Sequence, residues 1–459
     1  MNFGNKTLWT ALLAVLCVAL AVGCNDTLRQ FITQVPGPSG DPAASAQMVF
    51  LSNNPAGDGS DTHIDVSGDT RVAVIPSGPN PAFLGKSGSL AFIVNGNGTV
   101  TTYLALLQIT VFPPGTNTFT LPAITSGSAA GASTSNNNLY IANQNSNDVS
   151  VIPGGGTAAL GTNVLAGSQP VAIASNANSN KAYVVNRGSN NVTVISAIDN
   201  TVVGPPIPVG ASPIWAVMST DATHVFVVNQ GDGTVSVIDT VIDKVIPCAP
   251  GPSCNPVTHA ISVGASPNFA FYDSRLQRLY VNNSGANTLS VIKADGIDIG
   301  AVPPVLPGAL PPIALSAGPL PTSVTALADG TKAYVARGGC PAGINHTTLL
   351  ASIASCTGNL VSVIDATALQ EVGKITVAPG AVAVASSQDS TRVYVTNALD
   401  TIVPSPPGPA VAGGSVSVIR TSTNAEVVRI RAPQQDPNCV ATAAAPCPLQ
   451  TPFALSVFP

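Results

Sequence analysis

Charged residues are scarce in this sequence. Only 8% of its 459 residues are charged, and just two are glutamates, Glu371 and Glu426, whereas about a quarter is usual. Long helices draw heavily on Glu, Lys, Arg and Leu, so this composition argues against a helical fold. The 17 Lys and Arg are scattered and outnumbered by 22 Asp and Glu, which gives no basic surface for nucleic acid. We therefore expect no nucleic-acid partner.

Familiar catalytic and cofactor motifs are missing too. The chain has no G-x-S-x-G, H-E-x-x-H, phosphate-binding loop or C-x-x-C-H sequence, each of which marks a specific chemistry. Four acids cluster near the start of the body without calcium-loop spacing, and we interpret them as solvated turn residues: Asp58, Asp61, Asp65 and Asp69. The four histidines are widely separated: His63, His224, His259 and His346. We therefore assign no catalytic, cofactor-binding or metal-ligating residue and expect no cofactor.

A long apolar run occurs once, at the N-terminus. Lys6 precedes the apolar stretch Leu8–Ala21, which ends in small residues before Cys24. This order is typical of a secretory signal. The segment resembles the bacterial lipoprotein box, which implies lipidation of Cys24, although Ala21 stands where that box prefers Leu. Ordinary cleavage and a retained anchor helix are the alternatives, but the run is short for a bilayer span.

This interpretation divides the chain into three parts. Residues 1–23 form the signal peptide, 24–46 a tether rich in Pro, Gly, Ala and Ser, and 47–459 the folded body. Such composition predicts a flexible linker. We expect an exported monomer in the cell envelope, attached to the membrane only through its lipid.

The remaining cysteines agree with export. Cys17 lies in the signal, which leaves six that fall in three close pairs: Cys248–Cys254, Cys340–Cys356 and Cys439–Cys447. Six thiols allow 15 pairings, and pairing within each short loop needs least rearrangement of the chain. A zinc site competes weakly, because no pair has C-x₂-C spacing and only His346 lies inside one. We predict three disulfides formed in an oxidising compartment.

The body is repetitive. An aromatic segment that usually ends in Asn recurs, with clear copies at 139–143, 182–186, 225–229, 279–283, 333–337 and 393–397, a further copy at 91–95 and a loose one at 49–53. A Val-Ser-Val-Ile-like segment follows each clear copy, as in Asp148–Ile152. Both alternate with period two, which predicts half-buried β-strands. Runs of Asn, Gly and Ser between them predict hairpin turns.

Two more segments complete each unit. A proline-opened segment precedes the aromatic strand, with 13 residues from Pro to aromatic in four copies that begin at Pro170, Pro213, Pro267 and Pro321. Proline suits the first position of a strand. A fourth apolar segment, such as Thr201–Val209 or Gln370–Val377, closes most units. Four strands at a period of roughly 40–60 residues predict a blade of a β-propeller.

The combined Pro…Tyr-Val-x-Asn…Val-Ser-Val-Ile signature resembles the YVTN-repeat β-propeller family over about residues 47–459. We predict an all-β propeller of four-stranded antiparallel blades, eight by counting aromatic strands, with seven as the alternative. The segment Pro452–Phe458 matches a first strand, while the body begins near Met48 with a second strand. We therefore predict that the two chain ends pair in one blade, which removes free sheet edges.

Function is predicted to reside in the loops. The long segments 338–359, 398–414 and 433–451 should leave from one face of the disc, because alternate connections of a meander share a face. Loops on a rigid scaffold often carry recognition. Arg337 replaces a repeated Asn and His346 lies in the same loop, so we regard both as possible binding residues, with a solvated charge as the default for Arg337. The other repeated Asn should satisfy backbone groups at the corners.

Two functional hypotheses follow. The first is a non-enzymatic binding or scaffold module that presents this loop face to a protein or glycan. The second, which the family resemblance suggests, is a propeller-type enzyme similar to lactonase-like hydrolases, with its site at the central channel. Convergence of three or more ionisable side chains there would favour the enzyme. We expect the binding module.

Overall fold

The computed structural model is an all-β protein. It describes residues 47–53, 58–66, 68–79, 81–87, 90–95, 99–104, 109–110, 118–120, 129–135, 138–152, 162–175, 179–248, 251, 253–255, 257–295, 297, 308–341, 352–402, 411–412, 414–431 and 451–458. Within these ranges the only helix is a 3-10 turn, η2 (Ile353–Ser355). The prediction of a β fold is therefore confirmed.

The strands form eight sheets of four or five strands within the described ranges, and we number these sheets 1 to 8. Sheets 1 to 4 contain β1 (Gln47–Asn53), β2 (Asp58–Asp65), β3 (Thr70–Pro79) and β36 (Thr451–Phe458); β4 (Pro81–Ser87), β5 (Leu90–Asn95), β6 (Thr99–Leu104), β7 (Ile109–Thr110) and β8 (Thr118–Thr120); β9 (Ala129–Ser135), β10 (Asn138–Asn143), β11 (Asp148–Ile152) and β12 (Thr162–Leu165); β13 (Pro170–Ala174), β14 (Lys181–Asn186), β15 (Asn191–Ser196) and β16 (Ile207–Pro208).

Sheets 5 to 8 contain β17 (Pro213–Met218), β18 (His224–Asn229), β19 (Thr234–Asp239), β20 (Lys244–Val245) and β21 (Ile261–Ser262); β22 (Pro267–Asp273), β23 (Arg278–Asn283), β24 (Thr288–Lys293) and β25 (Ile313–Ala314); β26 (Ser323–Ala326), β27 (Lys332–Arg337), β28 (Leu360–Asp365) and β29 (Gln370–Thr376); β30 (Ala381–Ser386), β31 (Arg392–Asn397), β34 (Ser415–Arg420) and β35 (Ala425–Arg431). A two-stranded hairpin, β32 (Thr401–Ile402) with β33 (Val411–Ala412), is inserted in sheet 8.

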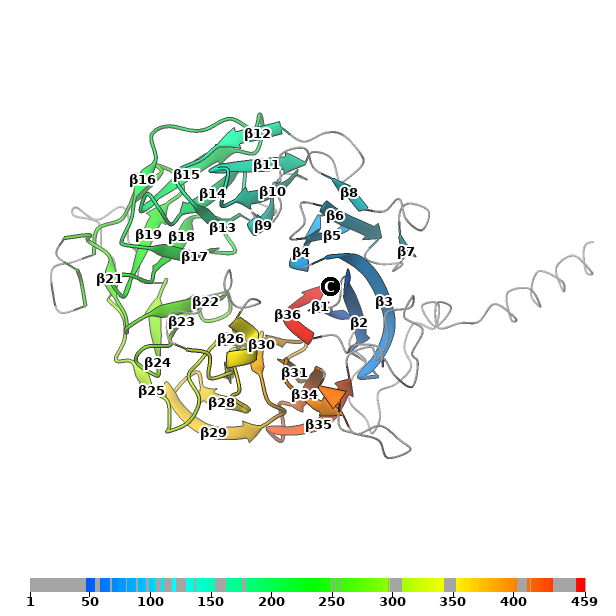
Figure 1. The fold of residues 1–459 in the computed structure, drawn as a ribbon. Coiled ribbons are helices and arrows are strands. Elements are labelled where there is room, and N and C mark those ends of the chain that lie inside the picture. The colour runs from blue at the N-terminus through cyan, green and yellow to red at the C-terminus, as the bar shows by residue number, and fades with distance from the viewer. Residues whose placement is uncertain are drawn as a thin grey trace, which may run out of the picture.

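Each sheet is an antiparallel meander, and Figure 1 shows the sheets side by side around a common centre. The first strand of each unit lies innermost. In sheets 4, 5 and 6 it opens with the predicted proline, and Pro170, for example, pairs with Asn186 of the next strand. A bulge follows this proline, so the ladder tolerates its missing N–H. In sheet 7 the strand begins at Ser323, two residues after Pro321.

Sheet 1 combines the two ends of the body. Its innermost strand, β36, pairs antiparallel with β1, from Gln47 opposite Phe458 to Asn53 opposite Thr451. Figure 1 shows β36 and β1 together near the centre. Each innermost strand also contacts the innermost strand of the next sheet, and β36 contacts both β30 of sheet 8 and β4 of sheet 2.

The core lies between neighbouring sheets. The aromatic residue of the second strand is fully buried in sheets 2 to 8, and its neighbours are mainly Val, Ile and Ala. Four of these tyrosines donate a hydrogen bond to the hairpin turn between strands three and four of the next sheet. The pairs are Tyr140 Oη to Asn200 Oδ1 at 2.8 Å, Tyr183 to Asp243 Oδ1 at 2.7 Å, Tyr334 to Asn424 Oδ1 at 2.8 Å and Tyr394 to Asp69 Oδ1 at 3.0 Å.

We call these contacts the tyrosine ties. Every acceptor adopts positive φ, between 49° and 59°, a conformation that Asn and Asp tolerate well. Sheets 2 and 5 carry Phe92 and Phe226 at the position of the tyrosine and have no hydroxyl to donate. Sheet 6 has a tyrosine, Tyr280, but it forms no tie, because Leu369 (φ 54°) occupies the acceptor position next to it. The Tyr280 hydroxyl is buried and finds no hydrogen-bond partner among the described residues.

The outermost strands differ in length around the ring. In sheets 4, 5 and 6 a two-residue strand, β16, β20 or β25, stands in this position, whereas β29 and β35 have seven residues each and β3 has ten. The predicted fourth segment Thr201–Val209 therefore pairs only in part, through a bridge from Val202 to Ile195 and through β16. Pro205 and Pro206 lie between these points and cannot donate ladder hydrogen bonds.

Candidate functional site

Two of the three predicted disulfides lie in the described residues. Cys248 pairs with Cys254, and Cys340 with Cys356. The first interrupts the outer edge of sheet 5, between β20 and β21, which both pair with β19. Cys24, Cys439, Cys447 and His346 lie outside the described residues. The two disulfides are consistent with export to an oxidising compartment.

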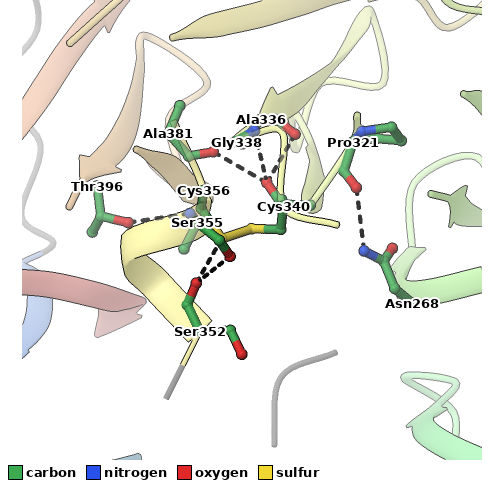
Figure 2. Close-up of a disulfide and its surroundings, with 12 residues drawn as sticks. Asn268, Pro321, Ala336, Gly338, Cys340, Ser352, Ser355, Cys356, Ala381 and Thr396 are labelled. Carbon is green, nitrogen blue, oxygen red and sulfur yellow. Dashed lines mark hydrogen bonds between the residues drawn. A yellow bond between two sulfur atoms is a disulfide. The ribbon is translucent and has the colours of Figure 1, made fainter. Parts of the chain in front are cut away.

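The Cys340–Cys356 disulfide closes the long loop of sheet 7. Both cysteines are buried, and they share one apolar cluster with Val382 and Ala398 of sheet 8 and with Ile75, Ala91 and Ile93 of sheets 1 and 2. Figure 2 shows the disulfide beside Ala381 and Thr396 of sheet 8. The ends of this loop are thus part of the core, while Ala354, Ser355 and Thr357 are exposed.

Arg337 departs from the prediction. It is fully buried, so the expectation of a solvated charge is wrong, while its role in binding stays a prediction. Its Nε donates to the carbonyl oxygen of Pro319 at 2.7 Å, and its Nη2 donates to Ser316 O at 2.7 Å and Asn287 Oδ1 at 3.1 Å. Arg337 therefore connects sheet 7 to the end of sheet 6.

Glu371 is the carboxylate that accompanies this arginine. Its Oε1 lies 3.7 Å from Arg337 Nη1, and it accepts hydrogen bonds from Ser362 Oγ at 2.6 Å and the Ser316 N–H at 2.7 Å. Burial alone would raise the pKa of Glu371, but the Ser362 and Ser316 hydrogen bonds and Arg337 bring it below its ordinary value. Burial lowers the pKa of Arg337, and Glu371 opposes that effect.

Sheet 1 buries acids that were expected to be solvated. Asp61 is fully buried in β2, where its Oδ2 lies 3.3 Å from His63 Nε2. Asp69 is 6% exposed and accepts a hydrogen bond from Arg392 Nε at 3.0 Å as well as the tyrosine tie from Tyr394. No signal in the sequence marked this burial, because residues 60–64 of the strand are polar at four of five positions and yet buried throughout.

The repeated Asn residues occupy the corners after the second strands, and six of them are fully buried. The Nδ2 of Asn229, for example, donates to Thr234 Oγ1 and Ser236 Oγ, both at 3.0 Å. The partners at most corners are side chains, where backbone groups were predicted. Asn397 does reach a backbone oxygen, Ala378 O at 3.1 Å, in the amide orientation that satisfies both of its ends. A Cβ at Gly210 would lie 2.6 Å from Asn229 Nδ2, so the corner requires glycine there.

The innermost strands carry a second candidate surface. Trp215 and Val217 of β17 and Phe269 and Phe271 of β22 are only partly buried, and we call these four residues the inner aromatic rim. The Trp215 and Phe269 ring centroids are 4.9 Å apart, and Trp215 Nε1 donates to Ala270 O at 3.0 Å. This group is apolar, and Figure 1 shows β17 and β22, the strands that carry it, on the inner side of their sheets.

Among the described residues, no three His, Cys, Asp or Glu side chains are grouped so that they could hold a metal ion. The same part of the chain contains no helix of the length and apolar character needed to cross a membrane.

No protein-family model matches the chain, and neither does any curated protein. Solved structures do. The dihydro-heme d1 dehydrogenase NirN, in complex with DHE, is 14% identical with a TM-score of 0.57, and the match covers 87% of this chain and 76% of NirN. Apo AztD from Citrobacter koseri is 12% identical with a TM-score of 0.57, covering 90% and 98%.

A third structure, the Cps50 (Swd1) beta-propeller domain from Myceliophteria thermophila, is 10% identical with a TM-score of 0.47 over 69% of this chain and 92% of that one. At such low identities a structural likeness concerns the fold alone. The arrangement of its sheets and its likeness to NirN and AztD make the chain a β-propeller-like protein, whose chemistry has to be argued from its own residues.

Proposed function

We propose that this protein is an exported, lipid-anchored β-propeller of eight blades that binds a partner at the cell envelope through one loop face. The observation that carries the proposal is the strand order. Three long connections, from β27 to β28, from β31 to β34 and from β35 to β36, leave from the same face of an antiparallel meander, whereas the comparably long connection from β24 to β25 leaves from the opposite face. Three adjacent sheets therefore direct their insertions to one side.

Closure of the ring gives this face a rigid base. Pairing of β36 with β1 and contact of β36 with sheets 8 and 2 support a closed arrangement. The tyrosine tie from Tyr394 to Asp69 supports closure independently. It joins sheet 8 to sheet 1 by the same contact that joins sheet 3 to 4, sheet 4 to 5 and sheet 7 to 8. A stapled loop on such a base loses less entropy on binding than a free one.

Partner binding is tested with arginine substitutions at exposed positions. The first variant carries three substitutions in and directly after the loop that the Cys340–Cys356 disulfide closes: Ala354→Arg, Ser355→Arg and Thr357→Arg. The second variant carries two substitutions on the opposite face of the same sheet: Thr367→Arg and Ala368→Arg. Crosslinking on intact cells, followed by identification of captured molecules, should lose its partner with the first set and keep it with the second. Equal capture by both sets would refute a binding role for this face.

Anchoring is tested separately with Cys24→Ser. Removing the thiol prevents lipid attachment, so the protein should move from the membrane fraction to the soluble fraction. Retention on the membrane would show that the lipid is not the anchor.

A further inference from the structure

The innermost strands differ in side-chain size at two equivalent positions. The first position is Ala172 in sheet 4 and Ala383 in sheet 8, but Trp215 in sheet 5 and Phe269 in sheet 6. These residues are equivalent because each pairs with the residue that precedes the corner Asn on the second strand. Two residues further on, alanine in sheets 4 and 8 is again replaced, by Val217 and Phe271. Sheet 2 also has an aromatic residue, Phe83, at the first position, but Gly85 follows it at the second. Among these sheets, large side chains at both positions are found in sheets 5 and 6.

Two buried amides beside this rim have unpartnered ends. Five corner Asn residues also have an unpartnered Oδ1 in the described structure, but only Asn282 is unpartnered at both ends. Asn268 is 4% exposed, and its Nδ2 donates to Pro321 O at 3.2 Å (Figure 2), but its Oδ1 has no hydrogen bond within the described structure. Asn282 is fully buried, and neither its Oδ1 nor its Nδ2 has a partner there. A buried polar group without a hydrogen bond costs about 1–3 kcal/mol, so such groups need an explanation.

The two amides lie where the rim can meet them. Asn282 pairs across the ladder with Phe269, so both side chains project from the same face of sheet 6. Asn268 precedes Phe269 in the bulge and reaches toward sheet 7 through its bond to Pro321. In sheets 4 and 5 the position of Asn282 is Val185 and Val228. The amide is therefore not required by the repeat.

We propose that the inner aromatic rim, with Asn268 and Asn282, is a binding site for a neutral saccharide. The inference rests on the proposed binding function and names its ligand class. Sugar hydroxyls both donate and accept hydrogen bonds, which suits amides with free ends, and the C–H faces of a sugar ring pack on aromatic rings. Apolar sites with a few placed polar groups are typical of small-ligand binding.

Charge supports a neutral ligand. The only charged side chain on β17, β22, β26 and β30 is Asp273, which is 3% exposed. Its Oδ1 accepts hydrogen bonds from the N–H groups of Arg275 and Leu276 in its own turn. An anionic ligand at the rim would find no positive charge on these strands to offset its loss of hydration, and the one negative charge, Asp273, is buried and engaged in its own turn.

Binding should change the environment of Trp215. Phe269 stands between Asn282 and the ring centre, so a hydroxyl group reaches the Asn282 amide only when the Phe269 ring turns aside. Trp215 contacts that ring. The chain has two tryptophans, Trp9 and Trp215, so a protein that begins after the signal reports only on Trp215.

The experiment is a fluorescence titration of residues 24–459 with maltotriose, cellotriose and chitotriose, repeated by calorimetry. We expect a saturable change in Trp215 emission with at least one trisaccharide. Asn282→Val and Phe269→Ala should each weaken binding about tenfold or more, and both introduce residues that other sheets carry at these positions. Phe83→Ala, at the equivalent position of sheet 2, is the control and should bind as the unmodified protein does.

Two results would overturn the inference. One is the absence of heat and of any emission change with all three sugars. The other is unchanged affinity in Asn282→Val together with a raised melting temperature, which would show that the amide only destabilises the core. Partner capture through the loop face does not involve the rim, so intact capture without sugar binding would overturn this inference alone.

Discussion

Sheets 4 to 6 and the group of sheets 7, 8 and 1 use the same repeat in different ways. Sheets 4 to 6 have outermost strands of two residues, and their inner seams are filled by apolar side chains. Sheets 7, 8 and 1 have outermost strands of seven to ten residues and hold two buried or nearly buried ion pairs, Arg337 with Glu371 and Arg392 with Asp69. Long insertions also leave from this second group.

The two groups differ in how deeply these ion pairs are buried. Lys181 and Asp243, which join sheets 4 and 5, are partly exposed, whereas the two pairs just named in sheets 7, 8 and 1 are largely shielded from water. Charged hydrogen bonds are stronger and more directional than neutral ones.

Among the described residues, no tyrosine tie joins sheet 6 to sheet 7. Between these two sheets, Arg337 instead donates to Asn287, and Glu371 accepts from the N–H of Ser316. The comparison therefore predicts that polar substitutions matter most in the second group.

The largest effect is expected at Arg337. Arg337→Ala removes a fully buried guanidinium and leaves Glu371 with no cation, which typically costs about 3–5 kcal/mol. Arg429, whose side chain is 38% exposed beside Glu426, is the matched control, and Arg429→Ala should cost no more than about 1 kcal/mol. Urea unfolding followed by circular dichroism measures both. Equal shifts in midpoint would contradict the assignment of Arg337 to the core.

The tyrosine ties give a series of smaller effects. Replacing a tyrosine of a tie by phenylalanine removes one hydrogen bond and should lower the free energy of unfolding by about 1 kcal/mol. The variants are Tyr140→Phe, Tyr183→Phe, Tyr334→Phe and Tyr394→Phe. Tyr280→Phe removes a hydroxyl that has no partner in the described structure, so it should be neutral or stabilising. The same unfolding assay decides the matter, and a Tyr280→Phe cost equal to the others would show that this hydroxyl is satisfied.

Leu369→Asn should restore the missing tie. Asn accepts the positive φ of 54° more readily than Leu and places an acceptor beside the Tyr280 hydroxyl. We expect a gain of about 1 kcal/mol, seen as a higher melting temperature. The gain should disappear when Tyr280→Phe is added; a gain that persists would come from the backbone alone.

The smallest expected effect concerns pH, where the two regions should respond with opposite signs. The pKa of Glu371 lies below its ordinary value of 4.5, so its contribution is present above that pH and is lost as the pH falls through the folded-state pKa. Burial raises the pKa of Asp273 above its ordinary value of 3.8. Ionisation of Asp273 therefore costs more in the folded state than in the unfolded state, and this effect lowers the stability of the protein as the pH rises above 3.8. Glu371→Gln should flatten the acid limb of the stability curve, and Asp273→Asn should steepen it. Urea midpoints measured from about pH 3 to 7 test both signs.

Much of the fold could be predicted because the repeat is local. The alternation around Tyr183 and Val194, and the proline 13 residues earlier, depend on neighbours within one unit. The cysteine pairs were predictable for the same reason. The burial of Arg337 was not, because its carboxylate lies 34 positions later and its other contacts come from sheet 6. The unpartnered amide of Asn282 was equally hidden, since a polar residue at a strand position gives no signal that it is buried without a hydrogen-bond partner.

The tyrosine ties have a consequence for how such a chain changes in evolution. Sheets 4 and 8 each carry a hydroxyl for the junction with the next sheet and an acceptor for the junction with the preceding one, so at these junctions either unit could take the place of the other. Duplicating or deleting the unit that contains Tyr183 would leave a matching junction, because Tyr140 would then meet Asp243. The unit that contains Leu369 lacks the acceptor. A copy of this unit placed after another tyrosine would leave that hydroxyl without a partner, as happens at Tyr280.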